Sequence, residues 1–366
     1  MPRPSLLAPL AVLALLAGGC RGGGGAGPEP IVVGVAGPWQ EGYGQMARRG
    51  VELALAEINA GGGVGGRPLT ADMRDDGGDG ARAARIAGEF VANRALVAVV
   101  GHVNSGAMMA AARVYDGGLP AVATTASSPD LSGISPWAFR VISSDSVNGI
   151  DLARFARTLG PRAAILYEND AYGRGLAEAF QRHFGGEIIG VDPISSGDGD
   201  FEPFISFYQR RRPDVVFVAG TDASGLAILR EAKRQHLRAA FLGGDGWSAL
   251  TRDTATSEGA FAAVPFTPAD PRPDVQGFVA AFRERYDMEP DGNAALSYDA
   301  TRLLARAIGE VGPDRAALRD WLAGLRERGP FRGVTGPIAF NENGDVVGKG
   351  FVMTRISRGA LTVARR

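Results

Sequence analysis

Residues 96–131 constrain the fold of this chain more than any other stretch. They contain two short apolar strand patterns, at 96–100 and 119–123, and between them an alanine- and methionine-rich helix pattern that ends near Tyr115. A strand, a helix and a second strand in this order predict a βαβ unit with parallel strands. In such sheets a ligand binds beyond the carboxyl ends of the strands. We therefore expect a site where these two strands end.

The turns that follow these two strands carry small hydroxyl residues where a helical segment starts. Ser105 follows the first strand, and Thr125 and Ser127 follow the second. Hydroxyls and free backbone N–H groups at a helix start suit an anion. The turn 101–106 lacks the lysine of a P-loop, and no G-x-G-x-x-G follows any strand, so the pattern favours a carboxylate over a phosphate. Helix capping alone would also explain Ser105 and Ser127.

The length and rhythm of the chain indicate two domains. A chain of 366 residues exceeds one typical core. Strand and helix patterns alternate over residues 31–142, and a second series with the same rhythm follows up to residue 266. Three helical patterns come next, at 275–286, 294–311 and 315–328, and we expect a hairpin-like end around Asn343-Gly344. Two α/β units in tandem place a cleft between two sets of strand ends, which favours hinge closure around a small ligand.

The single cysteine, Cys20, follows an N-terminal export signal. Residues 1–19 contain one basic residue, an apolar run too short to span a bilayer, and then small residues, which is typical of a secretory signal peptide. The run from Leu16 to Cys20 resembles a bacterial lipobox, in which the cysteine is lipidated and becomes the mature N-terminus, although the leucine stands one residue further from the cysteine than is common. Ordinary cleavage without lipidation is the alternative. Residues 20–30 then form a glycine-rich, flexible tether.

Enzymatic chemistry finds little support in the sequence. The nearest approach to the hydrolase motif G-x-S-x-G, at 246–250, lacks the second glycine. The chain has three histidines, and no His, Cys and carboxylate cluster has the spacing of metal ligands. Lys plus Arg (39) nearly balance Asp plus Glu (40), so nothing indicates nucleic acid or an anionic membrane surface as a partner. We expect a protein that is not an enzyme and needs no cofactor or metal.

Capture of a zwitterion agrees better with the polar residues at the predicted strand ends. The first half of the chain supplies hydrogen-bond donors at Ser105, Thr125 and Ser127, and the second half supplies Asp245 and Tyr172. An Asp-Gly turn would by itself explain Asp245, and packing would explain Tyr172. Three aromatic residues could wall an apolar side-chain pocket, although loop packing is an equal alternative: Trp39, Tyr43 and Trp247.

Short motifs spread over residues 31–360 resemble the periplasmic leucine/isoleucine/valine-binding proteins, the branched-chain amino acid receptors of ABC importers. Each motif is weak by itself, but their order over the whole mature chain is specific. They are AEINAGG at 56–62, VGH at 100–102, SSPDL at 127–131, YGRG at 172–175, FEPFI at 201–205 and YDA at 298–300.

The resemblance implies an α/β fold of two Rossmann-like, doubly wound lobes joined by a multi-strand hinge, the type I periplasmic binding protein fold. The boundaries that we expect are a signal peptide at 1–19, the lipidated Cys20 and tether at 20–30, an N-terminal lobe at 31–142 plus 268–348, and a C-terminal lobe at 143–267 plus 349–366.

The resemblance also implies roles for single residues. Ser105, Ser127 and the backbone of Thr125 would hold the ligand carboxylate, and Tyr172 and Asp245 would take its ammonium. Further residues expected near the ligand are Tyr43, Thr221 and Tyr298.

The chain departs from the pattern of the family it resembles in two respects. Gly78 and Asn104 stand where some members have a disulfide, and Ser127 stands where threonine is frequent. Trp39 and Trp247 could reshape the pocket, so a branched-chain ligand is not assured by the resemblance; relatives bind aromatic acids, amides and urea.

These observations predict an exported, lipid-anchored solute-binding protein, located in the periplasm or at the cell surface. We expect a monomer that captures an amino acid with a branched-chain or other apolar side chain between its lobes and delivers it to an ABC permease in the inner membrane. A ligand-sensing receptor of the same fold, and a binder of an amide or an aromatic carboxylate, are the alternatives.

Overall fold

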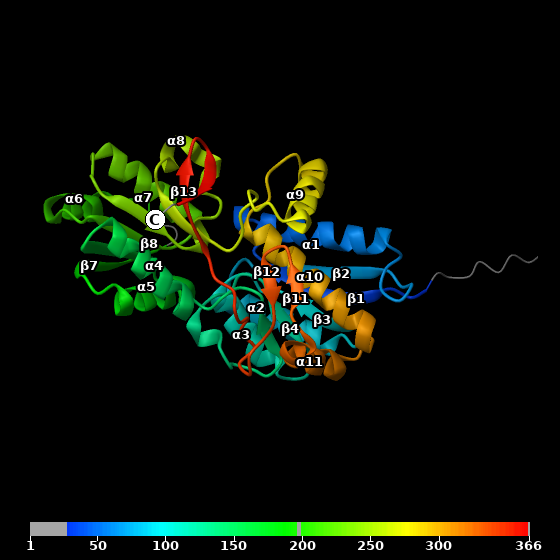
Figure 1. Cartoon of the computed structure of the whole chain (residues 1–366). Helices are drawn as coiled ribbons and strands as arrows, with labels where there is room; N and C mark the ends of the chain where they lie inside the picture. The colour runs from blue at the N-terminus through cyan, green and yellow to red at the C-terminus, as the bar shows by residue number, and fades with distance from the viewer. Residues whose placement is uncertain (1–27, 196–198, 365–366) are drawn as a thin grey trace, which may run out of the picture.

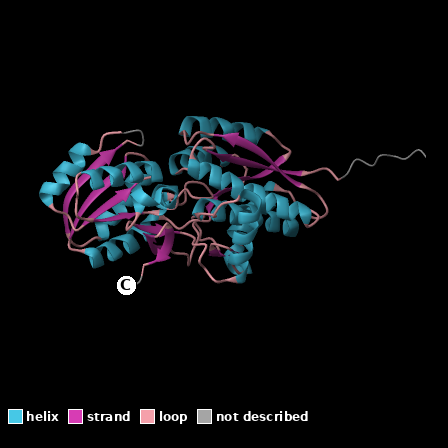
Figure 2. Ribbon diagram, turned by 90° about the horizontal axis from the view of Figure 1, so that it is seen from above, coloured by secondary structure: helices cyan, strands magenta, loops and turns pink. Residues whose placement is uncertain are grey.

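The computed structural model describes residues 28–195 and 199–364. The predicted signal peptide, Cys20 and most of the tether lie outside the described residues. Figure 1 shows two lobes side by side, each built around one sheet, and Figure 2 shows helices on both faces of each sheet. Among the described residues, no helix has the length and apolar character needed to cross a membrane.

The first lobe is built on a five-stranded parallel sheet with the strand order β2-β1-β3-β4-β5. The predicted βαβ unit is confirmed, since β3 and β4 pair in parallel and α3 connects them. All five residues of β3 are buried, as expected for a strand that is covered on both faces. The strands are β1 (Ile31–Gly37), β2 (Leu69–Asp75), β3 (Leu96–Val100), β4 (Ala121–Ala123) and β5 (Ala138–Arg140).

Helices cover both faces of this sheet because successive strand residues point to opposite sides. Val33 and Val35 of β1 pack into the core beneath α10, whereas Ala36 belongs to the core beneath α2 and α3. A further cluster joins α9 to α1 and α10. The helices of this lobe are α1 (Gly42–Ala60), α2 (Gly80–Ala92), α3 (Ser105–Tyr115), α9 (Pro273–Tyr286), α10 (Gly292–Val311), α11 (Arg315–Ala323) and α12 (Leu325–Arg328), with the short 3-10 helix η1 (Pro129–Leu131).

The second lobe is built on a seven-stranded sheet with the order β14-β13-β10-β9-β8-β6-β7, in which β13 and β14 run antiparallel to their neighbours. Ile165 and Phe217 face α4 and α5, and Leu166 and Val216 face α6 and α7. Its strands are β6 (Arg162–Glu168), β7 (Glu187–Ile194), β8 (Val215–Ala219), β9 (Ala240–Gly243), β10 (Phe261–Val264), β13 (Val352–Ser357) and β14 (Ala360–Val363). Its helices are α4 (Asp145–Leu159), α5 (Ala171–His183), α6 (Glu202–Arg211), α7 (Asp222–Arg234), α8 (Thr254–Ser257), η2 (Asp245–Trp247) and η3 (Leu250–Asp253).

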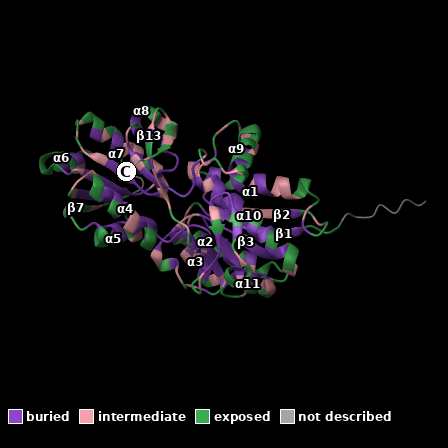
Figure 3. Ribbon diagram, viewed as in Figure 1, coloured by how far each residue is buried: buried purple, intermediate pink, exposed green. Residues whose placement is uncertain are grey.

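The chain passes between the lobes after β5, after β10 and before β13. Lys349 Nζ donates a hydrogen bond to the carbonyl of Val141 (2.8 Å), and Ser143 Oγ donates to the carbonyl of Lys349 (2.6 Å). Two of the connections are therefore hydrogen-bonded to each other. Figure 3 shows the central strands of both lobes as buried, whereas the edge strands β2 and β7 and the outer surfaces of the helices carry intermediate and exposed residues.

Two expectations about the C-terminal region are wrong. The segment after Gly350 does not form a hairpin with residues 337–340: β13 joins β10 of the second lobe, where Thr354 and Ile356 become fully buried. The segment before the turn pairs instead as β12 (Gly336–Ile338) with β11 (Phe331–Gly333). Short pairing does cross the predicted turn, through the antiparallel Phe340–Val346 bridge and the hydrogen bonds from Val347 N–H to the Ala339 carbonyl (2.9 Å) and from Asn341 N–H to the Asp345 carbonyl (2.9 Å). The expected helix 315–328 is interrupted at Gly324.

Candidate functional site

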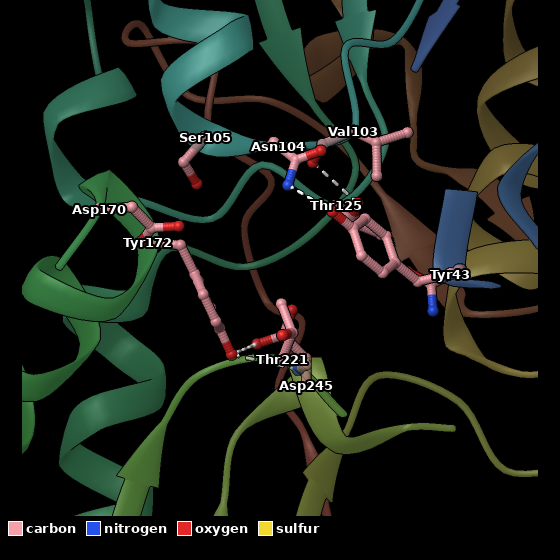
Figure 4. A pocket seen from close by; sticks show the side chains of 11 residues that line it. Tyr43, Val103, Asn104, Ser105, Thr125, Asp170, Tyr172, Thr221 and Asp245 are labelled. Atoms are coloured by element: carbon pink, nitrogen blue, oxygen red, sulfur yellow. Dashed lines mark hydrogen bonds between the residues drawn. The ribbon is translucent and has the colours of Figure 1, made fainter. Parts of the chain in front are cut away.

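An open cavity lies between the two lobes, at the carboxyl ends of both sets of strands (Figure 4). This is the location that parallel α/β sheets favour for a ligand. Residues from turns and helix starts of both lobes line the cavity: Tyr43, Val103, Asn104, Ser105, Thr125 and Asn293 from the first lobe, and Asp170, Tyr172, Thr221, Asp245 and Gly246 from the second.

The first-lobe wall is organised around Ser105, the first residue of α3. Ser105 Oγ accepts hydrogen bonds from the backbone N–H groups of Ser127 (3.2 Å) and Ser128 (3.1 Å). The hydroxyl proton of Ser105 remains for a group in the cavity, and the two incoming hydrogen bonds polarise this hydroxyl. Thr125 Oγ1 donates to the carbonyl of Val103 (3.0 Å), which joins the two turns that follow β3 and β4.

The second-lobe wall presents an acid and a phenol that bind each other. Tyr172 Oη donates to Asp245 Oδ1 (3.0 Å) and accepts a hydrogen bond from the N–H of Gly246 (3.1 Å), as Figure 4 shows for the side chains. Trp247, the last residue of η2, is fully buried and anchors this short helix in the core. The indole fits because a Cβ at Gly225 or Gly243 would lie only 2.4 or 2.1 Å from it.

Carboxyl groups dominate the electrostatics of the site. Burial raises the pKa of Asp245 to about 6. Burial, together with the nearby Asp245, raises the pKa of Asp145 to about 8. The pKa of Asp170 is also raised by burial. Among the described residues, no lysine, arginine or histidine lines the cavity, so it favours a ligand that brings a positive charge.

Six of the residues expected from the sequence line this one cavity. They come from both lobes and are Tyr43, Ser105, Thr125, Tyr172, Thr221 and Asp245.

Four expected residues do not line the cavity, and each has a physical reason. Ser127 is fully buried, and its Oγ donates to Asp145 Oδ2 (2.9 Å). Tyr298 Oη donates to Glu57 (2.6 Å). Trp39 packs against the core of the first lobe, and Trp247 lies in the core of the second. Neither tryptophan lines this cavity, and packing, the alternative left open by the sequence, describes both.

The remaining lining residues were not expected from the sequence. Val103 and Asn104 belong to the same turn as Ser105, and Asp170 caps the helix that carries Tyr172, accepting the N–H of Gly173 at 2.7 Å. Because these residues lie next to the expected Ser105 and Tyr172, the sequence could have indicated that they line the cavity. Asn293 reaches the cavity from the start of α10, far away in sequence, and no local motif marks it.

The cavity does not contain the parts of a hydrolase or a metal centre. His102 is fully buried, and its two ring nitrogens contact Asp76 (2.6 Å) and Tyr115 (2.9 Å) rather than Ser105. Within the described residues, no group of His, Cys, Asp and Glu side chains is arranged to hold a metal ion.

Comparison with known proteins agrees with this geometry. The profile of the periplasmic binding protein family matches residues 30–360, and the chain belongs to this family. Within it, the chain groups with the branched-chain amino acid binding proteins of ABC importers.

Three similar proteins illustrate the relationship. The Leu/Ile/Val-binding protein homolog 1 of Brucella abortus is 28% identical over 330 residues, 87% of each chain. The crystal structure of the substrate-binding protein LivJ from Streptococcus pneumoniae in complex with isoleucine has a TM-score of 0.86 at 26% identity and covers 92% of this chain and 99% of that one. A substrate-binding protein from Desulfitobacterium hafniense in complex with leucine has a TM-score of 0.80 at 33% identity, with 92% and 100% covered.

Proposed function

We propose that this protein captures an α-amino acid between its lobes and delivers it to the permease of an ABC importer. The observation that carries the proposal is the opposed chemistry of the two cavity walls. One wall offers the Ser105 hydroxyl at the start of α3, and the other offers the Asp245 carboxylate beside Tyr172. This arrangement is complementary to a group that is negative at one end and positive at the other.

The ligand carboxylate would bind at the first-lobe wall. There the Ser105 hydroxyl can donate, and the positive end of the α3 dipole adds a favourable field. The ligand ammonium would bind the Asp245 carboxylate. Charge-assisted hydrogen bonds contribute roughly 1.5–3 kcal/mol each, so a few of them together with buried area support micromolar binding, about −8 kcal/mol.

The decisive experiment is the substitution Asp245→Ala. Loss of the carboxylate leaves a buried ammonium unpaired, so we expect amino acid affinity to fall by at least about 100-fold, roughly 3 kcal/mol. Titration calorimetry with branched-chain amino acids, the ligands named for the relatives, measures the effect. Asp320→Ala is the matched control, because that carboxylate is 65% exposed and does not line the cavity. Undiminished affinity in Asp245→Ala would refute the assigned role.

The acid-rich cavity favours an amino acid over an aromatic carboxylate. A benzoate-type ligand brings no ammonium, so Asp245 would lose its solvation without gaining a partner. We expect no measurable binding of benzoate under conditions in which an amino acid binds. A sensor of the same fold would bind the same ligand, and uptake of labelled ligand by the reconstituted importer separates transport from sensing.

We further propose that the protein acts as a monomer whose N-terminal lobe (31–142 plus 268–348) and C-terminal lobe (143–267 plus 349–366) close as two bodies around the ligand. We also propose that Cys20 carries the lipid that holds the protein at the membrane. Mass spectrometry of the mature N-terminus, expected to show a diacylglycerol on the cysteine, and size-exclusion chromatography with light scattering test the anchor and the monomer.

A further inference from the structure

The cavity offers few aliphatic side chains for contact with a ligand side chain. Of the eleven lining residues in the described part of the chain, Val103 is the only aliphatic one. Trp39 and Trp247, the large apolar side chains nearest to it in sequence, pack into the two lobe cores instead. A pocket that selects an aliphatic side chain is lined mainly by apolar groups. The composition of this wall indicates another kind of ligand.

Hydroxyl and amide groups line the rest of the cavity, away from Ser105 and Asp245. Asn104 Nδ2 donates to Tyr43 Oη (2.9 Å), which leaves the Tyr43 hydroxyl proton for another acceptor. The side chain of Asn293 makes a single long hydrogen bond, from Nδ2 to Asp291 Oδ2 (3.4 Å), and among the described residues its Oδ1 has no hydrogen-bond partner. These groups are solvated in the open cavity and lose that solvation when a ligand fills it.

An aliphatic ligand side chain would leave these polar groups desolvated and unpaired. A polar side chain with a hydroxyl or carboxamide would supply the missing partners to Asn293 and Tyr43. An acidic side chain is disfavoured, since Asp170 and Asp245 also line the cavity and no basic residue does. The wall therefore matches a side chain that is polar, short and uncharged.

We propose that the site selects uncharged polar amino acids, of the threonine and asparagine type, over branched aliphatic ones, and that Asn293 is a specificity-determining residue. This inference rests on the proposed function, because it assumes that the zwitterionic part of the ligand binds at Ser105 and Asp245. Discrimination arises because a site built to hydrogen-bond a substrate rejects an analogue that leaves its buried polar groups unpaired.

Two pairs of amino acids with matched shapes provide the test. Threonine and valine differ by a hydroxyl in place of a methyl group, and asparagine and leucine differ by a carboxamide in place of an isopropyl group. Titration calorimetry should show at least about tenfold tighter binding of the polar member in at least one pair. If valine and leucine bind as tightly as their polar partners or more tightly, the inference is overturned and the proposed function stands. If none of the four binds, both are overturned.

The variant Asn293→Leu tests the residue itself. It replaces the amide by an aliphatic group of similar size, and we expect the affinity ratio of polar to aliphatic ligand to fall by about tenfold. A ratio does not depend on the fraction of folded protein, so a partly misfolded sample remains informative. Asn93→Leu, at the exposed end of α2 and outside the cavity, is the control and should leave the ratio unchanged. An unchanged ratio in Asn293→Leu would overturn the assignment.

Discussion

Asp145 shows how one buried carboxyl group links this site to pH. Its Oδ2 accepts the Ser127 hydroxyl (2.9 Å), its Oδ1 accepts Asn148 Nδ2 (3.2 Å), and the residue is fully buried. The pKa of Asp145 is raised to about 8 by burial and by Asp245. An unfolded aspartate titrates near 4, so between about pH 4 and 8 the folded protein holds a proton that the unfolded chain has released. The stability that this proton provides is present at low pH and is lost as the pH rises towards 8.

The variant Asp145→Asn should remove this pH dependence. The new amide cannot ionise, and Asn148 Oδ1, which has no hydrogen-bond partner, can turn to accept from it. We expect the free energy of unfolding of the unliganded protein to fall less steeply between about pH 5 and 8 than in the wild type, where the loss reaches up to ~1.4 kcal/mol per pH unit. Urea denaturation at a series of pH values measures the slope. Equal slopes in variant and wild type would contradict the role given to Asp145.

Ser105 offers a second prediction at the scale of a single residue. The variant Ser105→Ala removes the acceptor of two buried N–H groups and one donor to the ligand carboxylate. We expect the unliganded protein to lose ~1–3 kcal/mol of stability, and ligand affinity to fall by about tenfold, less than in Asp245→Ala because the ligand carboxylate can take over the freed N–H groups. Denaturant titration and calorimetry measure the two effects. The exposed Ser146→Ala should stay within about 0.5 kcal/mol of wild type.

At the scale of the element, the order of strands and helices was predictable from the sequence, whereas the burial of Trp247 and the position of Asn293 at the cavity were not. The segment β3–α3–β4 follows from its apolar runs and small turn residues, which placed Ser105 and Thr125 at the strand ends. The sequence did not predict the burial of Trp247, because the indole fits into a space left by two glycines, Gly225 and Gly243, that no local sequence pattern connects with it. Asn293 was not predicted to line the cavity for the same reason, since only tertiary packing brings the start of α10 to the cavity.

The packing of the Trp247 indole against Gly225 predicts how a substitution there affects η2. In Gly225→Ala the new methyl group would lie 2.4 Å from the indole nitrogen, so the indole must move, and with it the turn that carries Asp245. We expect a loss of ~1–3 kcal/mol in the free energy of unfolding, accompanied by weaker ligand binding. Gly277→Ala is the matched control in α9, where a methyl group would meet nothing within 4 Å, and it should stabilise the protein by ~0.5–1 kcal/mol. If both variants behaved alike, packing of η2 against α7 would not be what positions Asp245.

At the scale of the whole molecule, contacts between the lobes differ in how strongly they depend on the ligand. Ser127 of the first lobe binds Asp145 of the second inside the protein, next to a chain connection, and does not need the ligand. Arg252 of η3 instead reaches from the surface of the second lobe towards Asp291, the N-terminal cap of α10 in the first, with 3.8 Å between Nη2 and Oδ2. Gly42 leaves room for it, since a Cβ there would lie 2.5 Å from Arg252 Nη1. This ion pair lies where the two lobes approach each other.

The variant Arg252→Ala should therefore reveal what the ion pair contributes to holding the lobes together. The arginine side chain is 43% exposed and the pair is long, so solvent screens the attraction and its contribution should not exceed ~1 kcal/mol. We expect ligand to dissociate up to about fivefold faster, with the difference shrinking as salt is added because the screening length falls. Stopped-flow dissociation at low and high ionic strength measures this, with Arg154→Ala, which breaks an exposed pair within α4, as the control. An effect that is independent of salt would mean that Arg252 acts by packing against the start of α1, and the lobes would then be held by shape rather than by charge.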